Sequence, residues 1–233
     1  MNDDFINILM ANGIERSVAE KMNDFADILV AENEKYNLTA ITDYPSMAYL
    51  HFLDSVYHMD QIIRAEGTVK IMDIGTGGGF PAVPLAICFS NTEITALDAT
   101  EKKTRFLTNA CDRLKISNVR AINGRAEILS RSDEYSARYD MIISRAVASL
   151  PVILEIGCRF LKTGGVAVIY KGPGYEEEIK NAEKAIDVLG FTLKEAVKTE
   201  LNDMDHYLII LEKKKETPHK YPRSFSKIAK HHL

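Results

Sequence analysis

The sequence is poor in cysteine and has no long apolar run. Only three cysteines, Cys88, Cys111 and Cys158, are spread over 233 residues, and none forms a Cys-x-x-Cys pair. This spacing excludes a disulfide framework and a zinc knuckle, and it is typical of a reducing cytoplasm. No apolar run approaches the roughly 18 residues of a membrane-spanning helix, and the acidic N-terminal sequence is unlike a secretory signal. We therefore expect a cytoplasmic protein without a membrane segment.

The rest of the composition is that of an ordinary globular protein. Hydrophobic residues make up 46% and charged residues 27%, which excludes disordered, collagen-like and low-complexity chains. The net charge of −4 is unevenly distributed, because the segment from Lys213 onward has seven lysines and arginines against one acid. A local basic segment either binds a polyanion such as RNA or only keeps the chain soluble.

Three regions with different patterns follow one another. Residues 1–66 have the apolar spacing of helices, residues 67–212 alternate strands with helices, and residues 213–233 form the basic tail. The first region is predicted to be a helical cap and the second an α/β body. No internal repeat is apparent in the sequence.

Two helices are predicted within the cap. Ser17 and Glu20 have the spacing of a capping box, with Ser17 at the N-cap of a helix that ends near Tyr36. Pro45 suits the first turn of a second helix, which should continue to about Arg64.

The α/β body is predicted from the order of its elements. Strands alternating with helices form βαβ units, which indicate a mostly parallel sheet with helices on both faces. The last two strands are about six residues apart, too close for a parallel crossover, so they should form an antiparallel hairpin. Predicted strands cover 69–75, 93–98, 119–122, 139–144, 166–170, 192–199 and 206–211, and predicted helices start at Pro81 and cover 101–114, 152–161 and 176–189.

The most informative segment is the glycine-rich sequence from Asp73 to Pro81, DIGTGGGFP. It lies between a predicted strand and a predicted helix, as a nucleotide-binding loop does. Glycines there allow positive φ angles and a close approach of a ligand to the backbone, and a helix N-terminus attracts negative charge. The loop is therefore predicted to bind a ligand.

The spacing of the glycines distinguishes between ligand classes. The dinucleotide fingerprint requires glycine at the sixth position, which is Phe80 here, and the Gly-Lys-Ser/Thr of a Walker A loop is absent. The spacing G-x-G-x-G, with Asp73 two residues earlier, resembles motif I of class I S-adenosylmethionine-dependent methyltransferases. Backbone N–H groups near Gly75, Gly77 and Gly79, with Asp73, would complement the carboxylate and ammonium groups of this cofactor. An NAD-dependent oxidoreductase is the alternative.

Two further loops are predicted to complete the cofactor site. Asp98 ends the second strand, 19 residues after Gly79, and its carboxylate can accept hydrogen bonds from two ribose hydroxyls. Thr100 either assists Asp98 or caps the helix that begins at Glu101. Glu127 follows the third strand, where it either meets the adenine edge or is an exposed acid of a first helical turn.

The sequence lacks groups that other methylation reactions require. Amino-nitrogen methylation usually uses an Asn-Pro-Pro-Tyr-like loop after the fourth strand, where this chain has Ser144-Arg145-Ala146. Ring-carbon methylation needs a cysteine nucleophile, but Cys158 lies in an apolar helix and is predicted to be core. These absences favour an atom that is already nucleophilic, such as guanine N7. Placement of N7 against the methyl group then supplies the catalysis, with Arg145 as a candidate contributor and no metal.

His51 and Asp54 are three residues apart and share one face of the predicted second helix. The pair has two interpretations. The two side chains either border the ligand cleft or form an internal hydrogen-bonded pair that anchors the cap to the α/β body.

Several segments together carry a family resemblance. The glycine loop and the sequences at 36–39 (YNLT), 51–55 (HFLDS), 103–107 (KTRFL), 144–146 (SRA) and 170–172 (YKG) resemble the bacterial glucose-inhibited division protein B family, the 16S ribosomal RNA guanine-N7 methyltransferases. The glycine loop alone would indicate only a methyltransferase. The His-x-Leu-Asp-Ser and Ser-Arg-Ala sequences single out this family.

The resemblance implies a class I, Rossmann-like α/β fold with a mostly parallel sheet, an antiparallel last strand and an N-terminal helical cap. It also implies S-adenosylmethionine as cofactor and a guanosine in the decoding region of 16S ribosomal RNA, or of the assembled 30S subunit, as substrate. We expect a monomer. The cofactor-site residues that the resemblance implies are Gly75, Phe80, Asp98, Ala126, Glu127 and Arg145.

One departure from the family concerns the tail. Residues 217–223 match the family sequence, but residues 224–230 do not, which leaves the RNA-contact role of the last ten residues open. Two alternatives share the fold. A small-molecule methyltransferase is disfavoured by the basic tail, and a non-enzymatic RNA-binding protein is disfavoured by the intact Asp73, glycine loop and Asp98.

Overall fold

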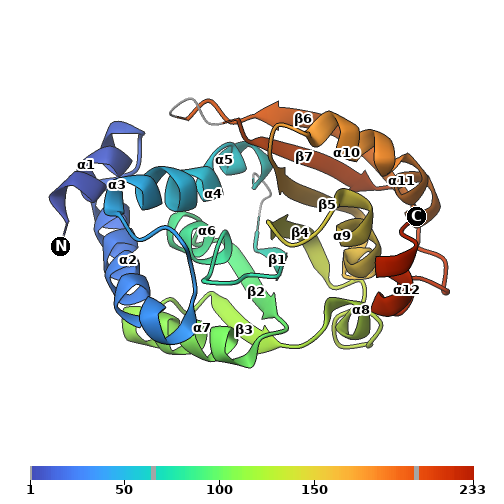
Figure 1. Cartoon of the computed structure of the whole chain (residues 1–233), viewed down its shortest axis with the longest axis horizontal. Coiled ribbons are helices and arrows are strands. Elements are labelled where there is room, and N and C mark those ends of the chain that lie inside the picture. Colours follow the sequence, from blue (N-terminus) through green and yellow to red (C-terminus); the bar gives the residue numbers. More distant parts are fainter. Residues whose placement is uncertain (1, 64–66, 202–204) are drawn as a thin grey trace. The chain divides into compact units, whose positions relative to one another are not determined.

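The computed structural model describes residues 2–63, 67–201 and 205–233 (Figure 1). The chain divides into two compact units, each built from two stretches of sequence. Unit 1 comprises Met1–Thr68 and Thr76–Asn123, and unit 2 comprises Val69–Gly75 and Gly124–Leu233. Residues 73–75 of the glycine-rich sequence therefore belong to unit 2, and residues 76–81 belong to unit 1.

Unit 1 combines the N-terminal helices with two parallel strands and the helices beside them. In β2 and β3 the register pairs Ile94 with Val119 and Asp98 with Asn123. The elements of unit 1 are α1 (Asp3–Ala11), α2 (Arg16–Tyr36), α3 (Tyr44–Met47), the π-helix η1 (Ala48–Leu53), α4 (Asp54–Val56), α5 (Met59–Ile62), α6 (Ala82–Cys88), β2 (Thr92–Asp98), α7 (Glu101–Leu114) and β3 (Val119–Asn123).

Phenylalanine rings form the centre of unit 1. The ring of Phe25, on α2, lies 6.2 Å from that of Phe52 and 5.9 Å from that of Phe80, both at steep angles. Phe52 also meets Phe5 edge to face at 5.0 Å. Edge-to-face pairs are stabilising beyond the area they bury. This cluster packs the N-terminal helices directly against the glycine loop.

Unit 2 contains the other five strands. β1 is parallel to β4 and β4 is parallel to β5, whereas β7 is antiparallel to both β5 and β6. The elements of unit 2 are β1 (Val69–Ile74), α8 (Ala126–Leu129), β4 (Tyr139–Arg145), α9 (Leu150–Gly157), β5 (Leu161–Lys171), α10 (Tyr175–Asn181), α11 (Glu183–Leu189), β6 (Phe191–Lys198), β7 (Tyr207–Lys213) and α12 (Phe225–Lys230).

The strand order confirms the predicted fold class. The seven strands form a mixed sheet of order β3-β2-β1-β4-β5-β7-β6. The predicted antiparallel hairpin corresponds to β6 and β7, and the helix predicted over 101–114 has the same bounds as α7. No helix within the described ranges has both the length and the apolar character needed to cross a membrane.

The two helices predicted in the cap differ from those observed. The N-cap of α2 is Glu15, whose carboxylate accepts from the Ser17 N–H, so the prediction of Ser17 as N-cap was wrong. The helix predicted from Pro45 is interrupted by η1 and again at His58, whose φ of 59° cannot continue a helix. The Ser55 hydroxyl donates to the His51 carbonyl and so competes with the backbone ladder. The predicted end of this helix near Arg64 lies outside the described residues.

Two later helices also differ from prediction. The helix predicted over 152–161 already ends at Gly157, and Leu161 begins β5. A Cβ on Gly165 would lie 2.9 Å from the Asp140 carbonyl oxygen, so glycine lets β5 approach β4 closely at a break in register. The helix predicted over 176–189 is divided at the buried Ala182 into α10 and α11.

Part of the basic C-terminal segment packs against unit 2. Arg223 forms a bidentate ion pair with the fully buried Glu155, at 2.7 and 2.6 Å. The Arg159 side chain donates to the Tyr221 carbonyl at 2.6 Å, and Ile228 of α12 is fully buried. These contacts assign Arg223 to the fold rather than to a solvated tail.

Candidate functional site

In unit 1 the glycine loop makes a tight turn directly beside the end of β2. The Thr76 N–H donates to the Leu97 carbonyl at 3.0 Å, and the N–H groups of Gly79 and Phe80 return to the Thr76 carbonyl at 2.9 and 3.0 Å. Gly77 and Gly79 have φ angles of 58° and 99°. Residues with side chains rarely adopt such angles, so the backbone of this turn depends on glycine.

Gly79 is also required by the packing around it. A Cβ at this position would lie 3.0 Å from side-chain atoms of Leu107 and Val83 and 3.1 Å from the ring of Phe25. The loop therefore sits directly on the apolar core of unit 1, with no room for a side chain.

Asp98 is joined to the glycine loop by hydrogen bonds. One carboxylate oxygen accepts from the Gly77 N–H at 3.0 Å, and the other accepts from the Thr100 N–H at 2.8 Å. Each carboxylate oxygen has a further lone pair, so Asp98 can still accept from ribose hydroxyls. Thr100 occupies the N-cap position of α7 without a side-chain capping bond. The structure thus brings Gly77, Asp98 and Thr100 together.

Thr76 has a buried polar group that the sequence analysis did not single out. Only 1% of the residue is exposed, and its hydroxyl oxygen has no hydrogen-bond partner among the described residues. Buried polar groups are almost always hydrogen-bonded. A polar ligand group bound at this loop would satisfy the hydroxyl, which fits the predicted cofactor.

His51 connects the cap to the glycine loop. Its ring stacks on Phe80 with 4.6 Å between centroids, and its Nε2 atom lies 2.7 Å from the Thr39 hydroxyl. Phe80 is 7% exposed. The His51 ring therefore joins Thr39 of the cap to Phe80 of the glycine loop.

In unit 2, Asp73 and Gly75 lie at the end of β1. Asp73 is fully buried. Gly75 has a φ of 77°, and a Cβ there would lie 2.3 Å from a methyl carbon of Val147. The Ser144 hydroxyl donates to the Ile74 carbonyl at 2.9 Å, which fixes the end of β4 against β1. The segment after β4 thus packs on Gly75.

The predicted adenine loop lies at the start of α8. Ala126 and Glu127 are only 7% and 9% exposed, so the interpretation of Glu127 as an exposed acid was wrong. The Arg125 side chain donates to the Glu127 carboxylate at 3.1 Å, and its guanidinium lies 4.7 Å from the centroid of the Phe225 ring. Glu127 is therefore an oriented, buried acid.

Arg145 ends β4 and is partly exposed, opposite Tyr170 in the β5 register. This is the carboxyl end of a parallel strand, where ligands of open α/β sheets bind. The next residue, Ala146, has a φ of 57° and turns the chain sharply away from the strand.

The predicted cofactor residues divide between the two units. Hydrogen bonds join Gly77, Asp98 and Thr100 in unit 1, and each of the others is placed at a strand end or loop of its own unit. Unit 1 contains Gly77, Gly79, Phe80, Asp98 and Thr100, and unit 2 contains Asp73, Gly75, Ala126, Glu127 and Arg145.

None of the three thiols is suited to nucleophilic catalysis. Burial raises the pKa of Cys88 and Cys111 to about 12 and that of Cys158 to about 11. The thiolate is the nucleophile, so all three side chains stay protonated near neutral pH. Cys158 is fully buried, which confirms its prediction as core.

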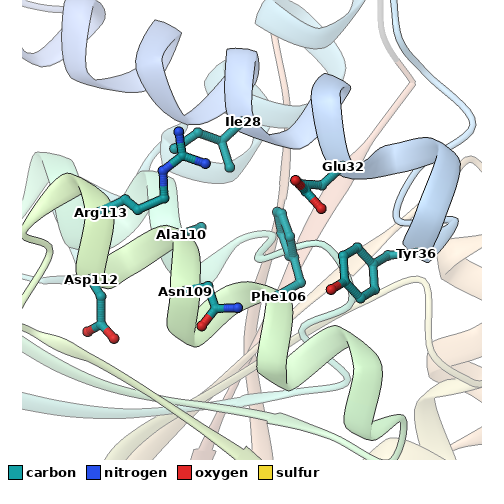
Figure 2. A pocket seen from close by; sticks show the side chains of 8 residues that line it. All are labelled: Ile28, Glu32, Tyr36, Phe106, Asn109, Ala110, Asp112 and Arg113. Atoms are coloured by element: carbon teal, nitrogen blue, oxygen red, sulfur yellow. The ribbon is translucent and has the colours of Figure 1, made fainter.

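A pocket of about 400 Å³ lies between α2 and α7 of unit 1 (Figure 2). Figure 2 shows aromatic side chains together with side chains of both charge signs around it. None of the predicted cofactor residues lines this pocket. Its lining residues are Ile28, Glu32, Tyr36, Phe106, Asn109, Ala110, Asp112 and Arg113.

Comparison with known proteins gives consistent matches. A family model described as rRNA small subunit methyltransferase G matches residues 18–207. The protein of that name from Alkaliphilus oremlandii is 41% identical over 209 residues, covering 88% of this chain and 87% of its own. The one from Lactococcus lactis subsp. cremoris strain MG1363 is 38% identical and covers 98% of this chain and 97% of its own.

A solved structure supports the fold. The SAM-dependent methyltransferase from Aquifex aeolicus matches with a TM-score of 0.57 at 17% identity, covering 72% of this chain and 93% of its own. At this level of identity the likeness concerns the fold alone. It agrees with the strand order described above.

Proposed function

The chain belongs to the rRNA small subunit methyltransferase G family, and we propose that it transfers the methyl group of S-adenosylmethionine to N7 of a guanosine in 16S ribosomal RNA. The observation that carries the cofactor assignment is the pair of backbone bonds that Asp98 accepts from Gly77 and Thr100. They hold an acid beside a glycine turn, which supports a site for a ribose and an amino-acid group.

Each unit contains residues for which a cofactor contact is proposed. In unit 1, Asp98 would accept from the ribose hydroxyls, and the buried Thr76 hydroxyl would meet a polar group of the amino-acid end. In unit 2, Asp73 would face the ammonium and Glu127 the adenine edge. The bound cofactor supplies a methyl group on a positively charged sulfur.

Transfer to guanine N7 demands little chemistry from the chain. N7 has an in-plane lone pair and carries no proton, so no general base is needed. Since all three thiols stay protonated, the chain offers no cysteine nucleophile for carbon methylation. What remains is to hold the base in line with the methyl group and exclude competing orientations, which can supply several kcal/mol. The planar guanidinium of Arg145 would orient the base or the cofactor as a hydrogen-bond donor.

RNA binding requires positive charge on the surface. Arg223 is used by the ion pair with Glu155, but Lys220, Lys227 and Lys230 of the C-terminal segment are exposed. We propose that these lysines contact RNA phosphates, which would position the RNA without reading its sequence. The substrate would be 16S RNA, free or in the 30S subunit, and the enzyme would act as a cytoplasmic monomer.

The direct test is methyl transfer from labelled S-adenosylmethionine to 16S RNA and to 30S subunits from a strain that lacks the enzyme. Chemical cleavage at N7-methylated guanosines then locates the product. The expected result is one modified guanosine. Label on a small molecule, or on another RNA atom, would contradict the proposal.

Gly77→Val is the variant that we expect to lose S-adenosylmethionine binding. Valine at a φ of 58° is strained and would place a branched side chain at the ligand surface. Calorimetry with S-adenosylmethionine should show binding to the wild type and none to this variant, while circular dichroism shows an unchanged fold. Binding of NAD in place of S-adenosylmethionine would favour the oxidoreductase alternative.

A further inference from the structure

The segment that follows β4 offers few side-chain partners for its own backbone. Ala146, Val147 and Ala148 have no polar side-chain groups, and Ser149 occupies the N-cap position of α9 without a capping bond. Loop carbonyls and the first N–H groups of a helix need hydrogen-bond partners. We call residues 146–150 the β4 loop.

Two charged side chains from later elements supply the partners. The Lys171 ammonium, at the end of β5, donates to the Ala148 carbonyl at 2.7 Å. The Leu150 N–H donates to the Glu178 carboxylate of α10 at 2.8 Å. Lys171 and Glu178 are themselves 2.6 Å apart. The ion pair therefore holds the β4 loop at two points.

This pair is more enclosed than an ordinary surface ion pair. The Lys171 side chain is 10% exposed and that of Glu178 33%. Glu178 takes the capping role that Ser149 leaves unfilled, with a negative charge at a helix N-terminus, where it is favoured. Lys171 belongs to the sequence YKG at 170–172, which carries part of the family resemblance but has no role in the cofactor site.

The β4 loop joins two parts of the candidate site in unit 2. It begins directly after Arg145, and its Val147 fills the space beside Gly75. A shift of the loop would therefore move both the Arg145 side chain and the surface next to Gly75.

We propose that Lys171 is a positioning residue for methyl transfer, which acts with Glu178 by fixing the β4 loop. The inference rests on the proposed function for its catalytic consequence. Lys171→Met should lower kcat by at least about tenfold, since a displacement of about 1 Å can cost a hundredfold in rate. The KM for S-adenosylmethionine should change much less, because most of its proposed contacts lie outside the β4 loop. Lys171→Arg keeps the charge and the donors and should recover part of the rate.

Lys162→Met is the matched control. Lys162 lies near the other end of the same strand, β5, and pairs with Asp140 at 2.7 Å. This pair is about half exposed, and it lies near the starts of β4 and β5, whereas the β4 loop follows the end of β4. Its loss should change kcat by less than about twofold, as expected for an exposed pair. Equal losses of kcat in the two variants would mean that any removed ion pair has this effect, which would overturn the proposal.

A second measurement does not depend on activity. Hydrogen exchange of the Leu150 amide should be faster in Lys171→Met and in Glu178→Ala than in the wild type, and unchanged in Lys162→Met. Glu178→Gln keeps an acceptor for this amide and should retain more protection than Glu178→Ala. Glu178→Ala is also the variant of choice for kcat if Lys171→Met fails to fold. Exchange rates that do not differ between these variants would overturn the proposal that the Lys171–Glu178 pair holds the β4 loop.

The two measurements separate the two hypotheses. Wild-type enzyme that methylates no 16S RNA would contradict the proposed function. Hydrogen exchange of the Leu150 amide in the variants would still test whether the Lys171–Glu178 pair holds the β4 loop. Active wild-type enzyme with a normal kcat in Lys171→Met and Glu178→Ala would contradict the positioning role alone.

Discussion

The two units stabilise their site residues by different interactions. In unit 1 the glycine turn rests on phenylalanine rings, and Asp98 is held by backbone N–H groups. In unit 2 the Glu127 carboxylate is oriented by Arg125, the β4 loop by Lys171 and Glu178, and the C-terminal segment by Arg223.

This difference has consequences for how each unit responds to change. Apolar packing is insensitive to salt and is lost in proportion to the atoms removed. An enclosed ion pair contributes little net stability, yet removing one partner leaves the other charged and buried. We therefore expect gradual losses in unit 1 for conservative substitutions, and abrupt losses in unit 2 when a single charge is removed.

The largest expected effect is on the ring cluster. Phe25→Ala should lower the free energy of unfolding by about 3–5 kcal/mol, the usual cost of removing a buried phenyl ring. The loss should be the same at low and high salt. Urea denaturation gives the value, with the exposed Phe225→Ala as control. A smaller loss in the free energy of unfolding at high salt would contradict the conclusion that apolar packing stabilises unit 1.

The second prediction breaks the charged contact of the C-terminal segment. Arg223→Ala leaves the Glu155 carboxylate fully buried without its bidentate partner. Since a quarter of the Arg223 side chain is exposed, we expect the lower end of the range for broken buried pairs, about 3 kcal/mol. Lys227→Ala, in the same segment but exposed, is the control. Equal denaturation midpoints for the two variants would mean that Arg223, like Lys227, is a solvated charge that does not stabilise the fold.

The difference between apolar packing in unit 1 and charged contacts in unit 2 also explains which features could be predicted from the sequence. Apolar spacing and local signals predicted α7, the parallel order of the early strands and the β6–β7 hairpin. The glycine spacing and the acid after β2 identified Asp98 and the loop, because these groups lie at the ends of consecutive strands.

Contacts between distant charges could not be predicted in this way. Glu155 and Arg223 are 68 positions apart, and nothing in either local sequence distinguishes a paired charge from a solvated one. Likewise, nothing in the sequence around Lys171 or Glu178 indicates that these two side chains bind the β4 loop. The π-helix at Ala48–Leu53 and the break at Ala182 depend on packing, which periodicity does not specify. The buried hydroxyl of Thr76 was detectable in principle, as a polar residue inside a glycine loop.

The third prediction concerns the cofactor acid of unit 1. Asp98→Ala removes the proposed acceptor for two ribose hydroxyls and two backbone bonds to the glycine turn. The affinity for S-adenosylmethionine should fall by roughly 2–3 kcal/mol, the scale of hydrogen bonds to a charged group. Calorimetry measures this loss, and Asp112→Ala, an exposed acid of α7, is the control. Unchanged affinity in Asp98→Ala would mean that another residue contacts the ribose.

The smallest effect is expected from the exposed lysines, and it separates two roles within one segment. If Arg223 holds the fold while Lys220, Lys227 and Lys230 meet phosphates, replacing these three lysines by glutamine should leave stability and the saturated methylation rate near wild type. The KM for RNA should rise, and its logarithmic dependence on salt should weaken by about 2, since each phosphate contact releases about 0.7 of a counterion on single-stranded nucleic acid. Methylation of 16S RNA across a salt series measures both quantities. An unchanged salt slope would mean that RNA binds elsewhere, whereas a collapsed saturated rate would mean that these lysines, like Arg223, maintain the folded site.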